Sequence, residues 1–215
     1  MVGYPEPPWR TFGRAFFQPF LVRAEALRGL PEGLEVERVG RWGIGLLGYV
    51  EYVAPSPLTY RELVWMPCRV RARLADGSST RGYFVERMYV DSQPSIAAGR
   101  ELWALPKARA DFEVDDASVR VRTEDGATLT IAIAARGPAW RARSRIATLQ
   151  PDGRELVRFV GSSDARVSSG RVELGARSGT EGWRGLAGAA RMRGLGVAMR
   201  SFETTMHEPR RLAWR

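Results

Sequence analysis

Short runs of alternating apolar and polar residues, separated by Gly, Asp and Pro, dominate this sequence. Residues 60–74 (YRELVWMPCRVRARL) and 80–91 (TRGYFVERMYVD) read as two long strands joined by a turn at ADGSS. Residues 118–136 predict a hairpin with Asp125-Gly126 at its turn, because Asp-Gly suits the tight turns between antiparallel strands. Runs of the same kind continue toward the C-terminus. The pattern predicts a mainly β fold (all-β to α+β), built as an antiparallel barrel or sandwich.

A few short helices are expected beside the strands. Residues 23–30 (RAEALRGL) contain good helix formers. Residues 93–105 (QPSIAAGRELWAL) place Pro94 in the first turn of a helix, where proline is tolerated, and Pro106 ends that helix. Lys107 is therefore expected at a junction between a helix and a strand.

The composition is that of an ordinary globular protein. The chain has 215 residues, of which 44% are hydrophobic and 27% are charged, and this length can bury a core without disulfides or metal ions. We take residues 1–215 as a single domain. No apolar run reaches the length of a signal peptide or a membrane span, so we expect a cytoplasmic protein with no membrane partner.

Several kinds of chemistry are excluded by residue counts and missing motifs. Cys68 and His207 are single residues of their kind, which rules out an intramolecular disulfide and a Cys/His zinc site. The sequence lacks the motifs GxxxxGK[ST], GxGxxG, HExxH and GxSxG. The net charge of +9 would suit an anionic partner, but the arginines are spread along the chain among apolar residues. We interpret them as a solvated sheet face and expect no nucleic-acid partner.

Lys107 is the only lysine among 33 Lys and Arg residues. A lysine amine can form a Schiff base with a ketone or aldehyde, which arginine in practice cannot. The attacking amine must be neutral, and a lysine with the ordinary pKa of about 10.4 is almost fully charged at pH 7. Burial or a neighbouring cation would have to lower that pKa. From the alternation alone, Lys107 falls with Arg109 on the polar face of its strand, so a solvated surface lysine is the alternative.

Residues 83–108 (YFVERMYVDSQPSIAAGRELWALPKA) resemble the acetoacetate decarboxylase family. The shared pattern is a strand ending in MY-hydrophobic-D, a P-x-I-A-x-G-R-E helix and then P-K, in the same order and spacing. Residues 59–70 (TYRELVWMPCRV) are similar to the family's strand with a Y-x-E, and residues 22–37 to its D-A-L-R…P-E-x-L-E segment. The resemblance covers roughly residues 14–115.

This resemblance implies a cone-shaped antiparallel β-barrel that assembles into homo-oligomers and encloses a pocket. By position, Lys107 falls on the family's Schiff-base lysine, Glu62 on an active-site glutamate, and Arg14 on an arginine that helps to hold the substrate. Met88 and Trp103 would line the pocket, although packing in the core is the alternative for both. The implied chemistry needs no metal or organic cofactor.

The chain departs from the family's decarboxylases at Ala108, where they have a second lysine directly after the first. Arg109 would be the replacement cation on the face of Lys107. We expect a Schiff-base enzyme that acts on a keto acid through Lys107, by decarboxylation or by aldol or dehydration chemistry. The alternative is a non-catalytic β-barrel of the same superfamily that binds a small molecule.

Overall fold

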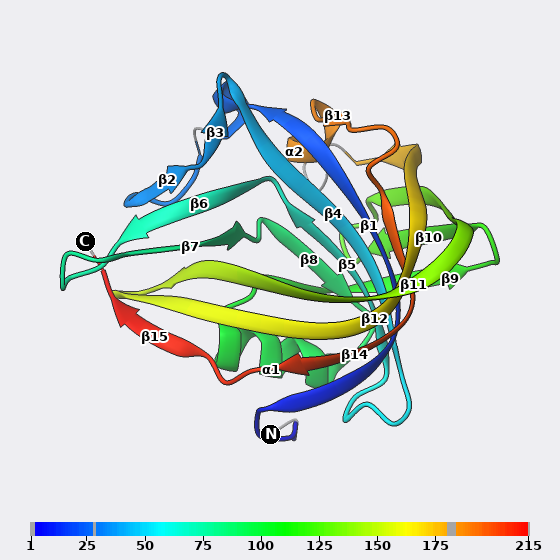
Figure 1. Cartoon of the computed structure of the whole chain (residues 1–215), viewed down its shortest axis with the longest axis horizontal. Coiled ribbons are helices and arrows are strands. Elements are labelled where there is room, and N and C mark those ends of the chain that lie inside the picture. Colours follow the sequence, from blue (N-terminus) through cyan, green and yellow to red (C-terminus); the bar gives the residue numbers. More distant parts are fainter. Residues whose placement is uncertain (1–2, 28, 180–183, 215) are drawn as a thin grey trace.

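A computed structural model describes residues 3–27, 29–179 and 184–214. Most of them lie in strands of one strongly curved sheet (Figure 1), which confirms the mainly β class. The strands are β1 (Trp9–Arg23), β2 (Leu34–Val36), β3 (Arg38–Val39), β4 (Trp42–Val53), β5 (Tyr60–Met66), β6 (Cys68–Arg73), β7 (Ser79–Phe84), β8 (Arg87–Val90), β9 (Lys107–Val114), β10 (Ser118–Thr123), β11 (Thr128–Asp152), β12 (Glu155–Ser178), β13 (Ala190–Arg191), β14 (Val197–Met206) and β15 (Arg210–Ala213). The helices are α1 (Gln93–Trp103), α2 (Arg184–Ala187) and the 3-10 helix η1 (Ala24–Leu27).

The sheet closes on itself. From β12 the hydrogen-bonded path runs through β14, β1, β4, β5, β8, β9 and β10 to β11, and β11 pairs again with β12 over most of its length. Almost all neighbours are antiparallel, but β8 and β9 are parallel, and so is the single pair between β7 and β11. Since parallel neighbours need a crossover connection, helix α1 between β8 and β9 explains the exception. This crossover positions the start of β9.

Turn and breaker residues account for most strand ends. The predicted hairpin forms from β10 and β11, and Gly126 takes the positive φ of 82° that its turn requires. The expected strand over 60–74 is divided into β5 and β6 at Pro67, which has no N–H to donate. Of the helix expected over 23–30, the described residues form the 3-10 turn η1, and residue 28 lies outside the described residues.

Buried apolar side chains pack in two clusters. The main cluster includes Phe20, Tyr49, Trp65 and Leu129. The second, which we call the helix-side cluster, joins α1 to neighbouring strands and contains Trp9, Ala15, Val50, Tyr52, Tyr60, Val64, Met66, Val85, Met88, Val90, Ile96, Ala98, Trp103, Leu105, Ala165, Val167, Phe202 and Met206.

Cys68 lies in the main cluster, where burial raises the pKa of its thiol to about 12. At neutral pH the thiol is therefore protonated and unreactive. None of the helices in the described part of the chain has the length and hydropathy of a membrane span.

Gly170 lets β12 lie against β14. A Cβ added at this position would lie 2.3 Å from the carbonyl carbon of Val197, which is backbone and cannot move aside. We expect Gly170→Ala to lower the free energy of unfolding by about 1–3 kcal/mol through overpacking, as measured by urea unfolding. Gly161→Ala in the same strand is the matched control, because its Cβ would meet no atom closer than 3.6 Å. Equal unfolding midpoints for the two variants would contradict this account of the strand contact.

Candidate functional site

Helix α1 and the start of β9 place Lys107 at the centre of a buried polar group. Ser92 caps α1 by accepting a hydrogen bond from the Ser95 N–H, and Ala104 ends the helix in the left-handed conformation with φ 51°. Pro106 follows, and β9 begins at Lys107 as expected. The Arg100 guanidinium then donates a hydrogen bond of 2.8 Å to the Lys107 carbonyl. The helix and the strand are thus tied together at this residue.

The Lys107 amine is enclosed by oxygen atoms and an aromatic ring. Its Nζ lies 3.0 Å from Glu62 Oε2, and it donates hydrogen bonds to Ser95 Oγ at 2.9 Å and to the Tyr60 hydroxyl at 3.4 Å. It also lies 4.8 Å from the centroid of the Tyr60 ring, a cation–π contact. The Lys107 and Glu62 side chains are only 3% and 7% exposed. Lys107 is therefore not a solvated surface lysine.

Strand register explains why these side chains meet. Met88 pairs with Lys107 across β8 and β9, while Glu62 pairs with Val90 across β5 and β8. Directly paired residues share a face of a sheet, and Met88 and Val90 are two positions apart on β8, so both pairs lie on one face. This face is the one that α1 covers. Gly99 of α1 leaves room for the lysine, because a Cβ there would lie 2.4 Å from Lys107 Cδ.

Two tyrosines complete the group. The Tyr52 and Tyr60 rings lie 4.4 Å apart between centroids, on paired positions of β4 and β5. Burial, together with the nearby Glu62 charge, raises the pKa of both phenols, and the Lys107 charge offsets part of the effect at Tyr60. Both side chains are therefore protonated hydroxyls at neutral pH.

The charge state of Lys107 depends on Glu62. Burial by itself lowers the pKa of the ammonium, but the Glu62 carboxylate, with smaller contributions from Tyr60, outweighs burial and holds the pKa above the usual lysine value. In this arrangement Lys107 is an ammonium group, and a nearby acceptor must take a proton before the amine can attack. Glu62 is that acceptor by position.

Arg14 lies apart from this group. It pairs with Glu51: Arg14 Nε lies 2.7 Å from Oε2 and Arg14 Nη2 lies 2.8 Å from Oε1. The Tyr49 hydroxyl donates to the same carboxylate at 2.7 Å. Glu51 follows Val50, which is the residue that pairs with Glu62. Because successive strand residues point to opposite faces, the Arg14–Glu51 pair lies on the other face of the sheet from Lys107.

The other predicted residues are in or near the helix-side cluster. Met88 is buried beside Lys107 through the β8–β9 pairing. Trp103 is buried against Trp9, with ring centroids 4.9 Å apart, and its indole N–H donates to the His207 carbonyl at 3.2 Å. Arg109 is 41% exposed, with its nearest carboxylate, Asp111, at 3.8 Å. The structure therefore groups Lys107 with Glu62 and Met88, and gives Trp103 a packing role.

Tyr60, Ser95 and Tyr52 were not among the residues predicted from sequence. Tyr60 carries a signal, because it precedes Glu62 by two positions in a strand and must share its face. Ser95 and Tyr52 carry none, since only the packing of α1 and β4 brings them near the lysine. Among described residues, no group of three or more His, Cys, Asp and Glu side chains is arranged to hold a metal ion.

Comparison with known proteins connects this geometry to one family. The family model described as acetoacetate decarboxylase (ADC) matches residues 6–178. The acetoacetate decarboxylase of Clostridium botulinum (strain Eklund 17B / Type B) is 30% identical over 146 residues, which are 62% of this chain and 52% of that protein. The chain thus spans about half the length of this curated relative.

Solved structures share the fold. The acetoacetate decarboxylase of Legionella pneumophila superposes with a TM-score of 0.64 at 17% identity, covering 98% of this chain and 89% of that one. The enduracididine biosynthesis enzyme MppR with bound HEPES gives 0.61 at 14% identity, covering 99% and 90%. An acetoacetate decarboxylase-like enzyme from Sphingomonas wittichii RW1 gives 0.56 at 18% identity, covering 97% and 94%. At these identities the likeness is one of fold.

Selective labelling of lysine makes the charge state of Lys107 measurable, because the chain has no other lysine. We expect its side-chain NMR signal to remain that of an ammonium past the ordinary lysine pKa of about 10.4. In Glu62→Gln, only the smaller contributions of Tyr60 oppose burial, and the midpoint should fall below that value. Leaving the buried ammonium unpaired should also lower the free energy of unfolding by about 3–5 kcal/mol.

Glu51→Gln is the matched control, since this carboxylate lies on the opposite face and its loss should leave the Lys107 titration unchanged. Folding raises the lysine pKa, so the contribution of the pair to stability is full below the unfolded-state pKa and is lost as pH rises through the native one. A wild-type midpoint below the ordinary lysine pKa would contradict the assignment of Glu62 as the dominant influence.

Proposed function

Because the chain belongs to the acetoacetate decarboxylase family, we propose that it is a Schiff-base enzyme in which Lys107 attacks the carbonyl carbon of a keto acid. The observation that carries the proposal is the single buried lysine with its amine 3.0 Å from a buried carboxylate. A lysine at this position of the matched motif is a nucleophile in reach of a proton acceptor. This arrangement suits imine formation.

In the first step, the Lys107 ammonium passes one proton to Glu62, and the resulting amine adds to the ketone. The carbinolamine oxygen then takes the proton back from Glu62 and a second proton from the lysine nitrogen, and leaves as water. The products are a protonated imine on Nζ and a Glu62 carboxylate, so one ammonium and one carbonyl have given one iminium and one water. Glu62 thus acts as a general base and then as a general acid.

The iminium draws electrons from the neighbouring bond. In decarboxylation, the bond between the α-carbon and the carboxylate breaks, carbon dioxide leaves, and the electron pair forms an enamine. Protonation at carbon and hydrolysis by water then return the ketone product and the lysine amine. The Tyr60 and Ser95 hydroxyls, both in hydrogen-bond contact with Nζ, would orient the amine during these steps.

The substrate class is a small keto acid. The reaction that follows imine formation is decarboxylation, or else aldol or dehydration chemistry. MppR, which shares the fold, has been solved with pyruvate and with the condensation product of pyruvate and imidazole 4-carboxaldehyde. These complexes support carbonyl compounds as the class to test. Because Ala108 stands in place of the second lysine of the family's decarboxylases, burial, Glu62 and Tyr60 are the influences on the pKa of Lys107.

The raised pKa of Lys107 favours one second candidate. If the ion pair with Glu62 persists when a ligand binds, the lysine is only a buried charge, and the protein is a non-catalytic binding module. The two candidates differ in whether a covalent bond to Nζ ever forms.

Borohydride trapping separates them. The protein is incubated with acetoacetate or pyruvate, reduced, digested and analysed by mass spectrometry. We expect a reduced adduct on Lys107, and with acetoacetate the adduct mass tells whether carbon dioxide was lost before reduction. Modification also blocks tryptic cleavage after Lys107, which gives a second readout.

Lys107→Arg is the control, because it keeps the positive charge beside Glu62 but does not form an imine. It should show no adduct and no turnover while retaining the fold. If wild-type protein gives no adduct with any member of a keto-acid and aldehyde panel, the Schiff-base proposal fails and the binding module remains.

A further inference from the structure

A cavity of about 400 Å³ lies away from the lysine site. It is formed by β1, β11, β12, β13 and the loop after β13, and it shares no residue with the group around Lys107. Its charged lining consists of the guanidinium groups of Arg136, Arg171, Arg191 and Arg193 and a single carboxylate, that of Glu173. The lining therefore has a formal charge of +3.

The carboxylate neutralises only part of this charge. Glu173 pairs with Arg191 at 2.7 Å and also with Arg171. Arg136 and Arg193 have no carboxylate within ion-pair distance among the residues that the structure describes. Two guanidinium groups thus face one cavity without a counter-charge.

Backbone contacts hold the wall of this cavity in place. Gln18, only 1% exposed, donates its side-chain amide to the Met192 carbonyl at 2.8 Å and so fixes the loop after β13. The Gly170 N–H donates to the Gly196 carbonyl at 2.8 Å. A Cβ at Gly196 would lie 2.4 Å from the Gly170 oxygen, so the two segments are in close contact. These contacts fix the backbone of the wall, while the Arg136 and Arg193 side chains are exposed at the cavity.

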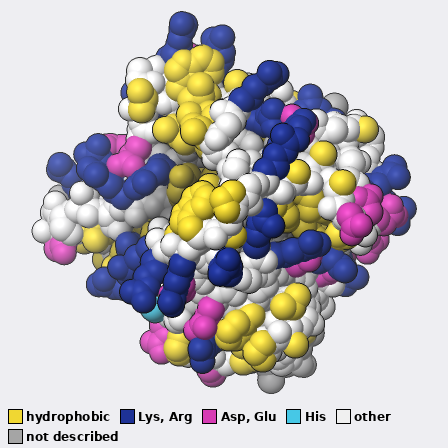
Figure 2. Space-filling view, turned by 45° about the vertical axis from the view of Figure 1, so that its right-hand side comes forward, with side chains coloured by type: hydrophobic (Ala, Val, Ile, Leu, Met, Phe, Trp, Pro, Cys, Tyr) yellow, Lys and Arg dark blue, Asp and Glu magenta, His cyan; other side chains and the backbone are white. Residues whose placement is uncertain are grey.

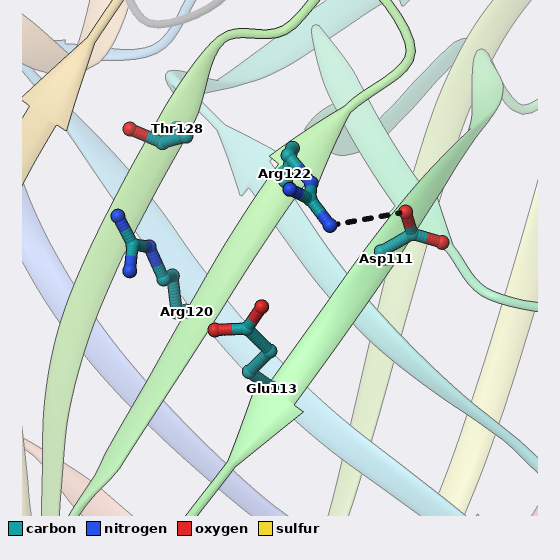
Figure 3. Close-up of a pocket in the computed structure, with 5 residues that line it drawn as sticks. All are labelled: Asp111, Glu113, Arg120, Arg122 and Thr128. Atoms are coloured by element: carbon teal, nitrogen blue, oxygen red, sulfur yellow. Dashed lines mark ion pairs between the residues drawn. The ribbon is translucent and has the colours of Figure 1, made fainter.

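A smaller cavity on β9, β10 and β11 shows what a self-neutralised arginine group looks like. It measures about 130 Å³ and contains Arg120 and Arg122 with Asp111 and Glu113 (Figure 3). Arg122 lies 3.9 Å from Asp111, and the formal charges sum to zero. Arginine content alone thus does not produce the excess charge of the larger cavity.

Figure 2 shows one face of the molecule, on which Lys and Arg side chains are scattered in several groups among apolar and acidic ones. A continuous basic stripe of the kind that binds a nucleic-acid backbone is absent from that view. A concave site with local excess charge instead suits a small anion.

We propose that the larger cavity binds a small organic dianion, carried either by a phosphate monoester or by two carboxylates. The two uncompensated guanidinium groups match two negative charges, and arginine binds phosphate and carboxylate oxygens in a bidentate way. The volume falls within the range of small-molecule sites, about 300–1,000 Å³, and leaves room for an organic group beside the charge. The site is independent of the proposed Schiff-base function.

Calorimetric titration at constant ionic strength tests this proposal, with phenyl phosphate and succinate as separate probes. The probe that binds more tightly identifies the source of the charge. Arg136→Gln/Arg193→Gln should weaken binding about tenfold or more, because hydrogen bonds to charged groups are lost. Arg120→Gln/Arg122→Gln changes the net charge equally at the smaller cavity and should change affinity less than about twofold.

A third variant should strengthen binding of the probes instead of weakening it. Glu173→Gln removes the one carboxylate of the cavity and frees Arg171 and Arg191, so binding should tighten several-fold. Lys107→Arg should bind the probes as the wild type does, and this separates failure here from failure of the proposed catalysis.

Three outcomes would overturn the proposal. One is an equal loss of binding in both double-arginine variants, which would indicate general surface charge. Another is no heat with either probe at millimolar concentration. The third is binding of a single-stranded oligonucleotide alone, weakened equally by both double variants, which would indicate a distributed nucleic-acid surface.

Discussion

The buried ion pair between Lys107 and Glu62 is the interaction on which the arrangement of the site depends. Removing both charges from water is unfavourable, and their attraction offsets this only when the remaining polar atoms are also satisfied. Here Ser95, Tyr60 and the Tyr60 ring supply those contacts. Three elements, β5, α1 and β9, must therefore be correctly placed at once. Displacing β5 or β9 would leave a charge unpaired in the interior, and displacing α1 would remove a hydrogen bond from the amine.

The crossover from β8 through α1 to β9 is the part of the fold that meets this requirement. It makes β9 parallel to β8, so that Lys107 starts its strand beside Met88, and β8 is the one strand between Lys107 and Glu62 on β5. The same helix carries Ser95 to the amine and covers the site. Pairing between β11 and β12 closes the sheet elsewhere, whereas Glu62, Tyr60 and Ser95, which contact the lysine amine, lie on β5 and α1.

The two faces of the sheet separate two groups of charges. Lys107 and Glu62 lie under α1, whereas Arg14 and Glu51 neutralise one another on the opposite face. A carboxylate held by Arg14 would therefore not lie beside the lysine in this arrangement. The arginine cavity formed by β1, β11, β12 and β13 is a third, separate charged group. Its excess charge is local, while the net charge of +9 is spread over the molecule.

The sequence by itself determined the strand-rich class, the hairpin at Asp125-Gly126, the helix before Lys107 and the family, because alternation, turn residues and a long motif are local signals. It also identified Lys107 as the nucleophile to test. Only the tertiary structure decided that Glu62 and Ser95 contact the amine, that Tyr52 packs against Tyr60 beside it, and that Arg14 lies on the other face. The physical reason is that strand pairing and helix packing bring together residues far apart in the chain. The pKa of Lys107 then follows from those neighbours, since burial alone would have moved it in the opposite direction.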